Sequence, residues 1–405
     1  MTSRARMPGA AMIEAQQFVE AARARGFTWY AGVPCSYLTP FINYVLQDGA
    51  LRYLSMANEG DAVAAMAGVA LGAPARGARA VAMMQNSGLG NAVSPLTSLT
   101  WTFRLPQLLI VTWRGQPGTH DEPQHALMGP ITPALLEQMQ IPWELFPASP
   151  EAVVPALERA VAHMDGSGRP YALVMPKGVV APFALREAAV APEDRPPQHR
   201  AAAREDTGRV RPSRGEALRA LLAHTDRPDT VVLASTGFCG RELYALDDRA
   251  NHFYMVGSMG CLSSLALGLA LSRPDLRVLA IDGDGAALMR MGALASVGAY
   301  APANLWHLLL DNAVHDSTGG QATVSPAISF PAVAAACSYA SAAQLSDAAQ
   351  LGPWLQGDGR PGPHFAALRT RTGTPPDLPR PRVTPVEVRE RLQRHLAGCA
   401  RGASA

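Results

Sequence analysis

Two apolar runs in the last third of the chain each lead into a short polar turn, and this arrangement constrains the fold more than any other feature. The run 277–281 precedes Gly-Asp-Gly at 283–285, and the run 305–310 precedes Asn312. Continuous apolar runs of this kind are typical of strands in a parallel sheet. Ligands of such sheets bind beyond the carboxyl ends of the strands. We therefore expect the oxygen atoms of Asp284 and Asn312 to lie together at a binding edge.

The residue types at this edge suit a magnesium ion. Carboxylate and amide oxygens are hard ligands, and Mg²⁺ usually keeps phosphate oxygens in its shell as well. A Gly-Asp-Gly triplet alone is also ordinary turn chemistry. The preceding strand, the spacing and the second strand ending in Asn favour a metal-diphosphate site over a plain turn.

The composition bounds the size of the core and the kind of partner. The chain has 405 residues, 48% of them hydrophobic, which is enough to bury two cores of similar size. Its 35 Lys and Arg residues nearly balance its 33 Asp and Glu residues, so no net field favours nucleic acid or an anionic membrane. The five cysteines are scattered and lack Cys-x-x-Cys spacing, which argues against a disulfide framework or a zinc site. With no apolar run of signal-peptide or transmembrane length, we expect a cytoplasmic protein that binds neither membrane nor nucleic acid.

Helical and strand-like patterns alternate along the chain, as in parallel sheets covered by helices on both faces. The predicted strands are 78–84, 108–113, 171–175, 230–235, 277–281, 305–310 and 364–368, and the predicted helices include 12–25, 60–72, 257–271, 286–298 and 383–395. Residues 188–214 are rich in Pro and charged residues and cannot bury a core. We therefore predict two α/β domains, 1–187 and 215–405, joined by the linker 188–214, with no domain between them.

Three glycine-rich turns follow strands in the second predicted domain, at 235–240, 257–260 and 283–285. Glycines let backbone N–H groups approach phosphate oxygens closely, and a helix that starts there adds the positive end of its dipole. Glycine is common in any turn between a strand and a helix, so one such turn alone decides nothing. Three in one domain, one of which carries Asp284, favour a diphosphate cradle.

The glycine turns and the Gly-Asp-Gly to Asn spacing resemble those of thiamine diphosphate enzymes. Met259, between two glycines and just before a helix, matches the apolar residue that bends the cofactor in that family, although a lone Met is more often a core residue. The resemblance implies a pyrimidine-binding domain at 1–187 and a diphosphate-binding domain at 215–405. It implies cofactor contacts from Thr236, Gly237, Gly257, Met259, Gly283, Asp284, Gly285 and Asn312, and a Mg²⁺ ion on Asp284, Asn312 and the backbone carbonyl of Val314.

Glu59 is the candidate for the carboxylate that thiamine diphosphate needs at N1′ of its aminopyrimidine. It follows Asn58 and leads into the apolar stretch 60–72. From the residues alone, Asn58 can be an N-cap and Glu59 can complement the helix dipole. A carboxylate at the start of so apolar a helix also lies near buried surroundings, where it needs a partner. The role at N1′, and with it a catalytic role, is implied by the resemblance.

Motifs in both halves resemble the phosphonopyruvate decarboxylases within this family, with the sulfopyruvate decarboxylases as near relatives. The motifs are Ala-Gly-Val-Pro-Cys-Ser at 31–36, Gln-Asn-Ser-Gly-Leu-Gly-Asn at 85–91, Trp-Arg-Gly at 113–115, Asp-Glu-Pro-Gln-His at 121–125 and His-Asp-Ser-Thr-Gly-Gly-Gln at 315–321. The resemblance implies substrate contacts from Ser36, Asn86, Ser87, Arg114, His125, Ser317 and Thr318, and a catalytic role for His315. From the residues, Arg114 with a histidine is a plausible clamp for a phosphonate anion, and a solvated polar loop is the alternative. The proton donor stays open among His120, His125 and His315.

The implied activity is the decarboxylation of 3-phosphonopyruvate to phosphonoacetaldehyde and carbon dioxide, with thiamine diphosphate and Mg²⁺, in the biosynthesis of phosphonates that include antibiotics. Sulfopyruvate or another anionic 2-keto acid is the nearest alternative substrate. A non-catalytic cofactor-binding subunit and a carboligating enzyme are further alternatives. In this family the cofactor lies between domains of neighbouring chains, so the resemblance also implies a homodimer or a larger homo-oligomer.

Overall fold

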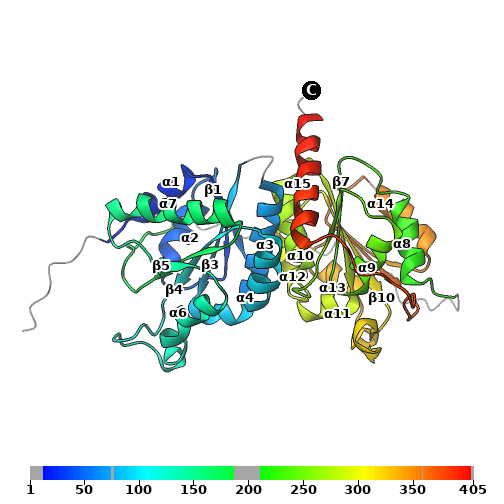
Figure 1. Cartoon of the computed structure of the whole chain (residues 1–405), viewed down its shortest axis with the longest axis horizontal. Helices are drawn as coiled ribbons and strands as arrows, with labels where there is room; N and C mark the ends of the chain where they lie inside the picture. Colours follow the sequence, from blue (N-terminus) through cyan, green and yellow to red (C-terminus); the bar gives the residue numbers. More distant parts are fainter. Residues whose placement is uncertain (1–11, 74–76, 187–209, 358, 403–405) are drawn as a thin grey trace, which may run out of the picture.

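The computed structural model describes residues 12–73, 77–186, 210–357 and 359–402 (Figure 1). Residues 188–209 of the predicted linker lie outside this described part, as do the outer ends of both predicted domains. The described residues form two α/β halves that lie side by side, the first within 12–186 and the second within 210–402 (Figure 1).

The first half contains a six-stranded sheet in which all neighbouring strands are parallel. Its strands are β1 (Phe27–Gly32), β2 (Arg52–Ser55), β3 (Arg79–Gln85), β4 (Leu108–Thr112), β5 (Trp143–Leu145) and β6 (Tyr171–Met175), in the order β2-β1-β3-β4-β6-β5. The chain leaves β1 toward one edge and returns to β3 on the other side. Such a switch point opens a crevice beyond the carboxyl ends of β1 and β3.

The second half repeats this strand order. Its sheet contains β7 (Thr230–Ala234), β8 (His252–Tyr254), β9 (Arg277–Gly283), β10 (Leu305–Asp311), β13 (Ser341–Leu345) and β14 (His364–Arg369). The strands lie in the order β8-β7-β9-β10-β14-β13, and all neighbouring pairs are parallel. When the strands are numbered from the first strand of each half, this order is the same as that of the first sheet. A separate antiparallel hairpin joins β11 (Val314–His315) and β12 (Gln321–Ala322). The predicted α/β fold with two parallel sheets is confirmed.

Helices cover both faces of each sheet. In the first half they are α1 (Ala15–Arg23), α2 (Thr39–Leu46), α3 (Glu59–Gly72), α4 (Leu89–Pro95), α5 (Trp101–Phe103), α6 (Met128–Gln138) and α7 (Pro150–Ser167). In the second half they are α8 (Arg214–Leu222), α9 (Phe238–Leu246), α10 (Leu262–Ser272), α11 (Asp284–Met289), α12 (Ala293–Tyr300), α13 (Phe330–Ala336), α14 (Leu351–Gln356) and α15 (Pro385–Gly402). Among these described helices, none is both long and apolar enough to cross a membrane.

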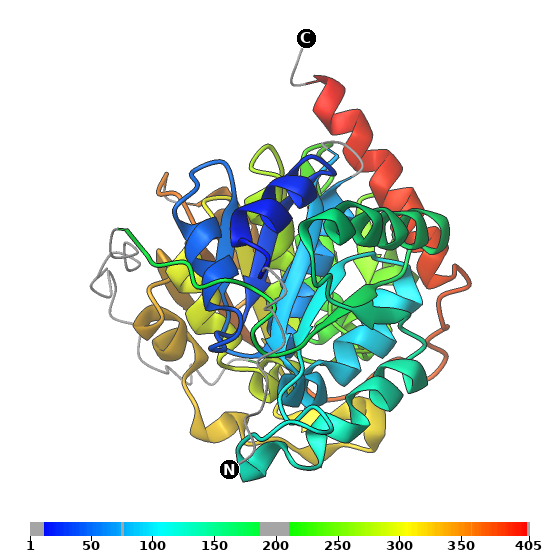
Figure 2. The ribbon, with the colours of Figure 1, turned by 90° about the vertical axis from the view of Figure 1, so that its left-hand side faces the viewer.

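Two buried apolar clusters hold the molecule together. One lies between α1, α2 and α7 and one face of the first sheet, where Phe18, Phe41 and Phe146 stack on one another. Figure 2, which faces the first half, shows α1 in dark blue and α7 in green on the same side of the strands. The other cluster runs from the opposite face of that sheet through α3 and α10 into the second half. The two halves therefore share one core.

The contact between the halves depends on two glycines in facing helices. A Cβ atom on Gly68 of α3 would lie 2.0 Å from the carbonyl oxygen of Leu265, and one on Gly268 of α10 would lie 1.8 Å from that of Ala65. Side chains larger than hydrogen therefore cannot occupy either position at this separation. Both helices follow the second strand of their own sheet, so the contact pairs equivalent elements of the two halves.

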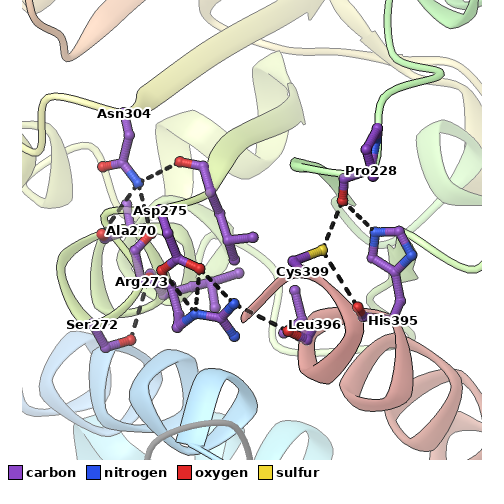
Figure 3. Close-up of polar contacts among 11 residues, drawn as sticks. Pro228, Ala270, Ser272, Arg273, Asp275, Asn304, His395, Leu396 and Cys399 are labelled. Atoms are coloured by element: carbon purple, nitrogen blue, oxygen red, sulfur yellow. Dashed lines mark hydrogen bonds and ion pairs between the residues drawn. The ribbon is translucent and has the colours of Figure 1, made fainter. Parts of the chain in front are cut away.

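The C-terminal helix α15 lies across this boundary and contacts α3, α5 and β8 (red in Figure 1). Figure 3 shows how Arg273, which follows α10 and is fully buried, pairs with Asp275 and donates to the carbonyl oxygen of Leu396 at 3.1 Å. One turn further along α15, Cys399 donates to the carbonyl oxygen of Pro228 at 2.8 Å. The helix is longer than the predicted 383–395 because its last turn has these partners.

Two further predicted helices differ from the observed ones. The predicted helix 286–298 is broken into α11 and α12 at Arg290, whose φ and ψ angles of −135° and 50° are not helical. The side chain of Arg290 donates to Asn58 and to the carbonyl oxygen of Asn91 in the first half. The predicted helix 257–271 begins only at Leu262. Its first residues form a turn in which Ser258 and Gly260 have positive φ angles, +53° and +85°, that a helix cannot contain.

Candidate active site

A pocket lies beyond the carboxyl ends of β7, β9 and β10, at the switch point of the second sheet. Its lining consists of Arg214, Ser235, Thr236, Gly237, Phe238, Cys239, Met259, Gly283, Asp284, Gly285, Ala286, Leu310, Asn312, Val314, His315, Asp316, Ser317 and Thr370. We call it the sheet-edge pocket. The prediction that the two polar turns meet at one edge is borne out by this lining, which contains both Asp284 and Asn312. All of its residues come from the second half.

Asp284 is the first residue of α11, and its side chain is buried. Its Oδ2 accepts a hydrogen bond of 2.6 Å from the hydroxyl of Thr323. Burial raises the pKa of this carboxyl, and the nearby Asp311 adds to the rise, while the bond from Thr323 opposes it. The carboxylate is therefore in surroundings where a bound cation would stabilise its charged form.

Asn312 lies in the turn that follows β10, and Val314 is the first residue of β11. The amide Nδ2 of Asn312 donates to Asp316 at 2.7 Å, and its Oδ1 accepts from the backbone N–H of Val314 at 3.2 Å. Between them Ala313 has a φ angle of +62°, which gives the turn its tight bend. Asp311 is buried, accepts from Ser325 at 2.6 Å and pairs with Arg369, so it stabilises the strand end from behind.

Gly285 lies under two side chains of the pocket. A Cβ atom at this position would be 2.4 Å from Cε1 of His315 and 3.2 Å from Cε of Met259. Because Gly285 has no side chain, the side chains of His315 and Met259 can both lie against this turn. At the other side Gly237, with a φ angle of +91°, forms the N-cap of α9. Gly257, also predicted to contact the cofactor, lies outside the lining, because its Cα faces Ser98 of the first half.

Glu59 is the first residue of α3 and does not line the sheet-edge pocket. It lies next to the interface between the halves, where Asn58 and Asp61 accept hydrogen bonds from Arg290. Its Oε2 accepts from Nδ2 of Asn91 at 2.8 Å. Gly88 lies against it so closely that a Cβ atom there would be 2.5 Å from the Glu59 carboxyl. Asn58 is the N-cap of α3, as one alternative from the sequence held, since its side chain accepts from the N–H of Gly60 at 2.8 Å.

The predicted substrate residues of the first half gather at the carboxyl edge of the first sheet. Asn86 is fully buried and donates to the carbonyl oxygen of Arg114 at 2.8 Å and to Thr132 at 2.9 Å. Ser87 is exposed and accepts from Gln85 at 2.6 Å. Ser36 is exposed next to Cys35, whose Sγ donates to Gln85 at 3.4 Å.

Arg114 and His125 belong to the loop that follows β4. His125 is buried, and its Nδ1 has no hydrogen-bond partner among the described residues. The guanidinium of Arg114, which the sequence predicts as part of a phosphonate clamp, is paired with Asp121, which accepts two hydrogen bonds from it. These bonds raise the pKa of Arg114 further and hold that of Asp121 well below its usual range.

Ser317 and Thr318 lie in the short 3₁₀ turn after β11 and are exposed. The hydroxyl of Thr318 donates to Gln321 at 2.9 Å within the hairpin. Only Ser317 of the two lines the sheet-edge pocket. Within one chain, the predicted substrate residues therefore form two groups, one at the edge of each sheet.

Arg214 and Asp316 line the pocket but were not among the predicted site residues. Arg214 is buried at the start of α8 and pairs with both Asp316, at 2.8 Å, and Glu242, at 3.2 Å. Burial raises the pKa of Glu242, and Arg214 opposes the rise. The sequence carries no local signal for this pair, because Arg214 falls at the end of the Pro-rich stretch 188–214, which composition assigns to a linker.

Comparison with known proteins places this geometry in a family. Residues 238–357 match the family described as thiamine pyrophosphate enzyme, C-terminal TPP binding domain. The chain is 47% identical to a phosphonopyruvate decarboxylase of Streptomyces viridochromogenes over 388 residues, which are 94% of each chain. It belongs to the phosphonopyruvate decarboxylase family. This is a family of thiamine diphosphate-dependent carboxy-lyases, as the resemblance of the motifs predicted.

Two further comparisons agree with this family. A sulfopyruvate decarboxylase of Methanosarcina acetivorans is 31% identical over 313 residues, 76% of this chain and 78% of that protein. In fold, the chain is similar to a putative thiamin diphosphate-dependent enzyme isolated from Mycobacterium smegmatis, with a TM-score of 0.66, 15% identity, and coverage of 90% of this chain and 100% of that one. That likeness concerns the two-sheet architecture.

The pocket of this phosphonopyruvate decarboxylase family member fits thiamine diphosphate and a divalent cation. The space above Gly285 would be filled by a single Cβ atom, and Gly237 opens the nine-residue helix α9, whose free N–H groups suit a phosphate. The oxygen donors are a carboxylate, an amide and a backbone carbonyl, which suit Mg²⁺ better than softer metals. In the described part of the chain, no group of three or more His, Cys, Asp or Glu residues is placed to hold a metal ion by itself.

Proposed function

We propose that this chain decarboxylates 3-phosphonopyruvate to phosphonoacetaldehyde and carbon dioxide. The observation that carries the reaction type is the sheet-edge pocket, in which Asp284, Asn312 and Val314 lie beside a glycine turn with Met259 and His315 above it. The substrate assignment rests on the 47% identity to a protein named phosphonopyruvate decarboxylase. Thiamine diphosphate, when bound, supplies the electron sink that allows carbon dioxide to leave.

Residues 215–405 form the diphosphate-binding domain in this proposal, and residues 188–214 link it to the pyrimidine-binding domain 1–187. Asp284, the amide oxygen of Asn312 and the carbonyl oxygen of Val314 hold Mg²⁺. Thr236 and Gly237, at the start of α9, bind a phosphate group through hydrogen-bond donors and the helix dipole. Gly283 and Gly285, which line the pocket, would allow the close approach of backbone to the cofactor, and Met259 would pack against it.

Glu59 provides the carboxylate for the aminopyrimidine in this proposal, and it comes from a neighbouring chain. In the described part of one chain, the sheet-edge pocket is lined by the second half alone, whereas Glu59 lies next to the interface of the two halves. A homodimer or larger homo-oligomer, in which a second copy presents its first half to the pocket, would bring the two together. Sedimentation of a fully active monomer would contradict this arrangement.

The substrate is bound between the same two surfaces. Ser36, Asn86, Ser87, Arg114 and His125 of one chain would face Ser317, Thr318 and His315 of the other. Arg114, oriented by Asp121, and His125 bind the phosphonate group, because charge-assisted hydrogen bonds from Arg are well matched to such an anion. His315, beside Gly285, delivers the proton to the carbon from which carbon dioxide has left.

Sulfopyruvate is the second candidate substrate, favoured by the 31% identity to a sulfopyruvate decarboxylase. Turnover of phosphonopyruvate, sulfopyruvate and pyruvate, each followed by carbon dioxide release and by the aldehyde formed, separates the two. The test withholds Mg²⁺ and thiamine diphosphate in turn. We expect phosphonoacetaldehyde from phosphonopyruvate without a second substrate, and activity only when both additions are present. A higher kcat/KM for sulfopyruvate would overturn the substrate assignment and leave the reaction type in place.

A further inference from the structure

The carboxylate of Asp316 determines how the side chain of Asn312 is turned. Its Oδ2 accepts a hydrogen bond from the side-chain Nδ2 of Asn312 at 2.7 Å, and the side chain of Asp316 is 10% exposed. An ionised carboxylate can only accept hydrogen bonds, whereas a side-chain amide carries a donor end and an acceptor end. The Nδ2 end of Asn312 must therefore face Asp316. Its Oδ1 end then lies on the side of the Val314 N–H, which donates to it at 3.2 Å.

Asp316 is itself held from two other parts of the second half. Arg214, at the start of α8, donates to the same Oδ2 at 2.8 Å, and Gly373, which follows β14, donates its N–H to Oδ1 at 3.4 Å. Arg214 in turn pairs with the buried Glu242 of α9. A carboxylate with partners on three sides cannot rotate without losing several of them. Residues of α8 and α9 therefore fix the position of Asp316, and Asp316 fixes the orientation of the Asn312 side chain in the turn after β10. A mere tether for the hairpin β11–β12 would not need a bond from Asp316 to the amide of Asn312.

We infer that Asp316, held by Arg214, is a positioning residue that turns the amide oxygen of Asn312 toward a divalent cation in the sheet-edge pocket and so sets the affinity for that cation. This inference rests on the proposed magnesium site. Outer partners that orient a metal ligand change metal affinity by about 10-fold to 100-fold when they are removed. The size of the effect therefore separates positioning from simple tethering.

The experiment measures Mn²⁺ binding to the full-length protein with saturating thiamine diphosphate, from the loss of the free Mn²⁺ signal in electron paramagnetic resonance, and then displacement by Mg²⁺. The variants are Asp316→Ala, Asp316→Asn and Arg214→Lys. We expect Asp316→Ala to raise the Kd for Mn²⁺ by about 10-fold to 100-fold. Asp316→Asn keeps an oxygen that can accept from Asn312 and should lose less. Arg214→Lys keeps one ionic contact and should be affected least.

Asp229→Asn is the matched control. It removes an aspartate whose ion pair with Arg227 lies at the surface, before β7, at the opposite end of the strands from the pocket. Its affinity for Mn²⁺ should equal that of the wild type. Thermal unfolding of each variant shows whether it is folded. If Asp316→Ala does not fold, Asp316→Asn takes its place in the test.

The outcomes separate the inference from the proposed function. A lower melting temperature with unchanged Mn²⁺ affinity in both Asp316 variants overturns the positioning role and leaves a tether. A wild type that binds Mn²⁺ with thiamine diphosphate, and loses affinity in the variants, but releases no carbon dioxide from phosphonopyruvate supports the positioning role and overturns the proposed function. A wild type that binds no Mn²⁺ overturns both.

Discussion

The carboxylate of Asp121 accepts two hydrogen bonds from the guanidinium of Arg114, of 2.8 Å from Nε to Oδ2 and 2.6 Å from Nη2 to Oδ1. The N–H groups of Gly115 and Glu122 donate to the same carboxylate, at 2.8 Å and 2.9 Å. The guanidinium also lies 5.1 Å from the centre of the Tyr37 ring. Arg114 therefore offers an anion a fixed set of N–H groups and little uncompensated charge.

We predict that Asp121→Asn raises the KM for phosphonopyruvate about tenfold with a smaller change in kcat, because a charge-assisted hydrogen bond of about 1.5 to 3 kcal/mol that orients Arg114 is lost. Steady-state kinetics check this. Asp165→Asn is the matched control, since Asp165 forms a similar two-bonded pair with Arg79 at the amino end of β3. A fall in KM for Asp121→Asn would show instead that Asp121 competes with the substrate for Arg114.

Glu59→Gln should remove most turnover while thiamine diphosphate and Mg²⁺ still bind. The amide keeps an oxygen for Asn91, so the local structure is preserved, but it cannot exchange a proton with the aminopyrimidine, which costs about 10²-fold to 10⁴-fold in kcat. Cofactor binding by calorimetry and turnover by carbon dioxide release are both needed. Unchanged turnover would remove Glu59 from the mechanism.

Two companion variants sharpen this prediction. Gly88→Ala places a Cβ atom 2.5 Å from the Glu59 carboxyl, so the carboxyl must move and turnover should fall although Glu59 is still present. Glu137→Gln, at an exposed position on α6, should behave like the wild type. A fully active Gly88→Ala variant would mean that the position of the Glu59 carboxyl is not critical.

Most central strands of both sheets follow from local sequence, whereas the central strand β1 and the edge strands β2, β5, β8 and β13 were not predicted. The strands β3, β4, β6, β9 and β10 are continuous buried runs, which leave a clear pattern. The edge strands β2, β5 and β8 have only three or four residues and include Arg52, Glu144 and His252. So short a segment becomes a strand only when its neighbour supplies hydrogen bonds, and a single sequence does not show that neighbour.

The site shows the same division. Asp284 and Asn312 end adjacent strands, so their meeting follows from the register of a parallel sheet. The pair of Arg214 and Asp316 joins residues 102 positions apart and has no local signal. The neutralisation of Arg114 by Asp121 depends on the path of one loop, which composition does not determine.

The buried carboxyl of Asp61 should make the stability of the fold depend on pH. Its side chain is 2% exposed in the first turn of α3. Burial raises its pKa from 3.8 to about 6, and Arg290 opposes the rise. The folded state therefore binds this proton more tightly than the unfolded state does, so the stability that the neutral form provides is present below pH 4 and is lost as the pH rises through about 6.

Asp61→Asn should accordingly be more stable than the wild type at pH 7.5, by at most about 3 kcal/mol, and the difference should shrink toward pH 4.5. Urea unfolding at both pH values measures this. Asp226→Asn, at an exposed position, should show no such change. A wild type that is more stable than Asp61→Asn at pH 7.5 would show that the ion pair with Arg290 outweighs burial.

The helix α15 should contribute to the stability of both halves. Leu392 is fully buried in the core that the halves share, while Gln393 donates to the carbonyl oxygens of Ala70 and Leu71 in α3, each at 3.4 Å. Leu392→Ala removes buried methyl groups and leaves a cavity, which costs about 2 to 5 kcal/mol. Arg394→Ala, on the exposed side of the same helix, should stay within about 0.5 kcal/mol of the wild type.

Urea unfolding at one fixed protein concentration tests this last prediction, since subunit association would otherwise change the midpoint. In a background in which Trp306 and Trp354 of the second half are replaced by Phe, fluorescence of the remaining tryptophans reports on the first half, and loss of bound thiamine diphosphate reports on the second. Because α15 contacts α3 and α5 as well as β8, we expect Leu392→Ala to shift both transitions together. A shift in the second half alone would mean that α15 stabilises its own half and does not join the two.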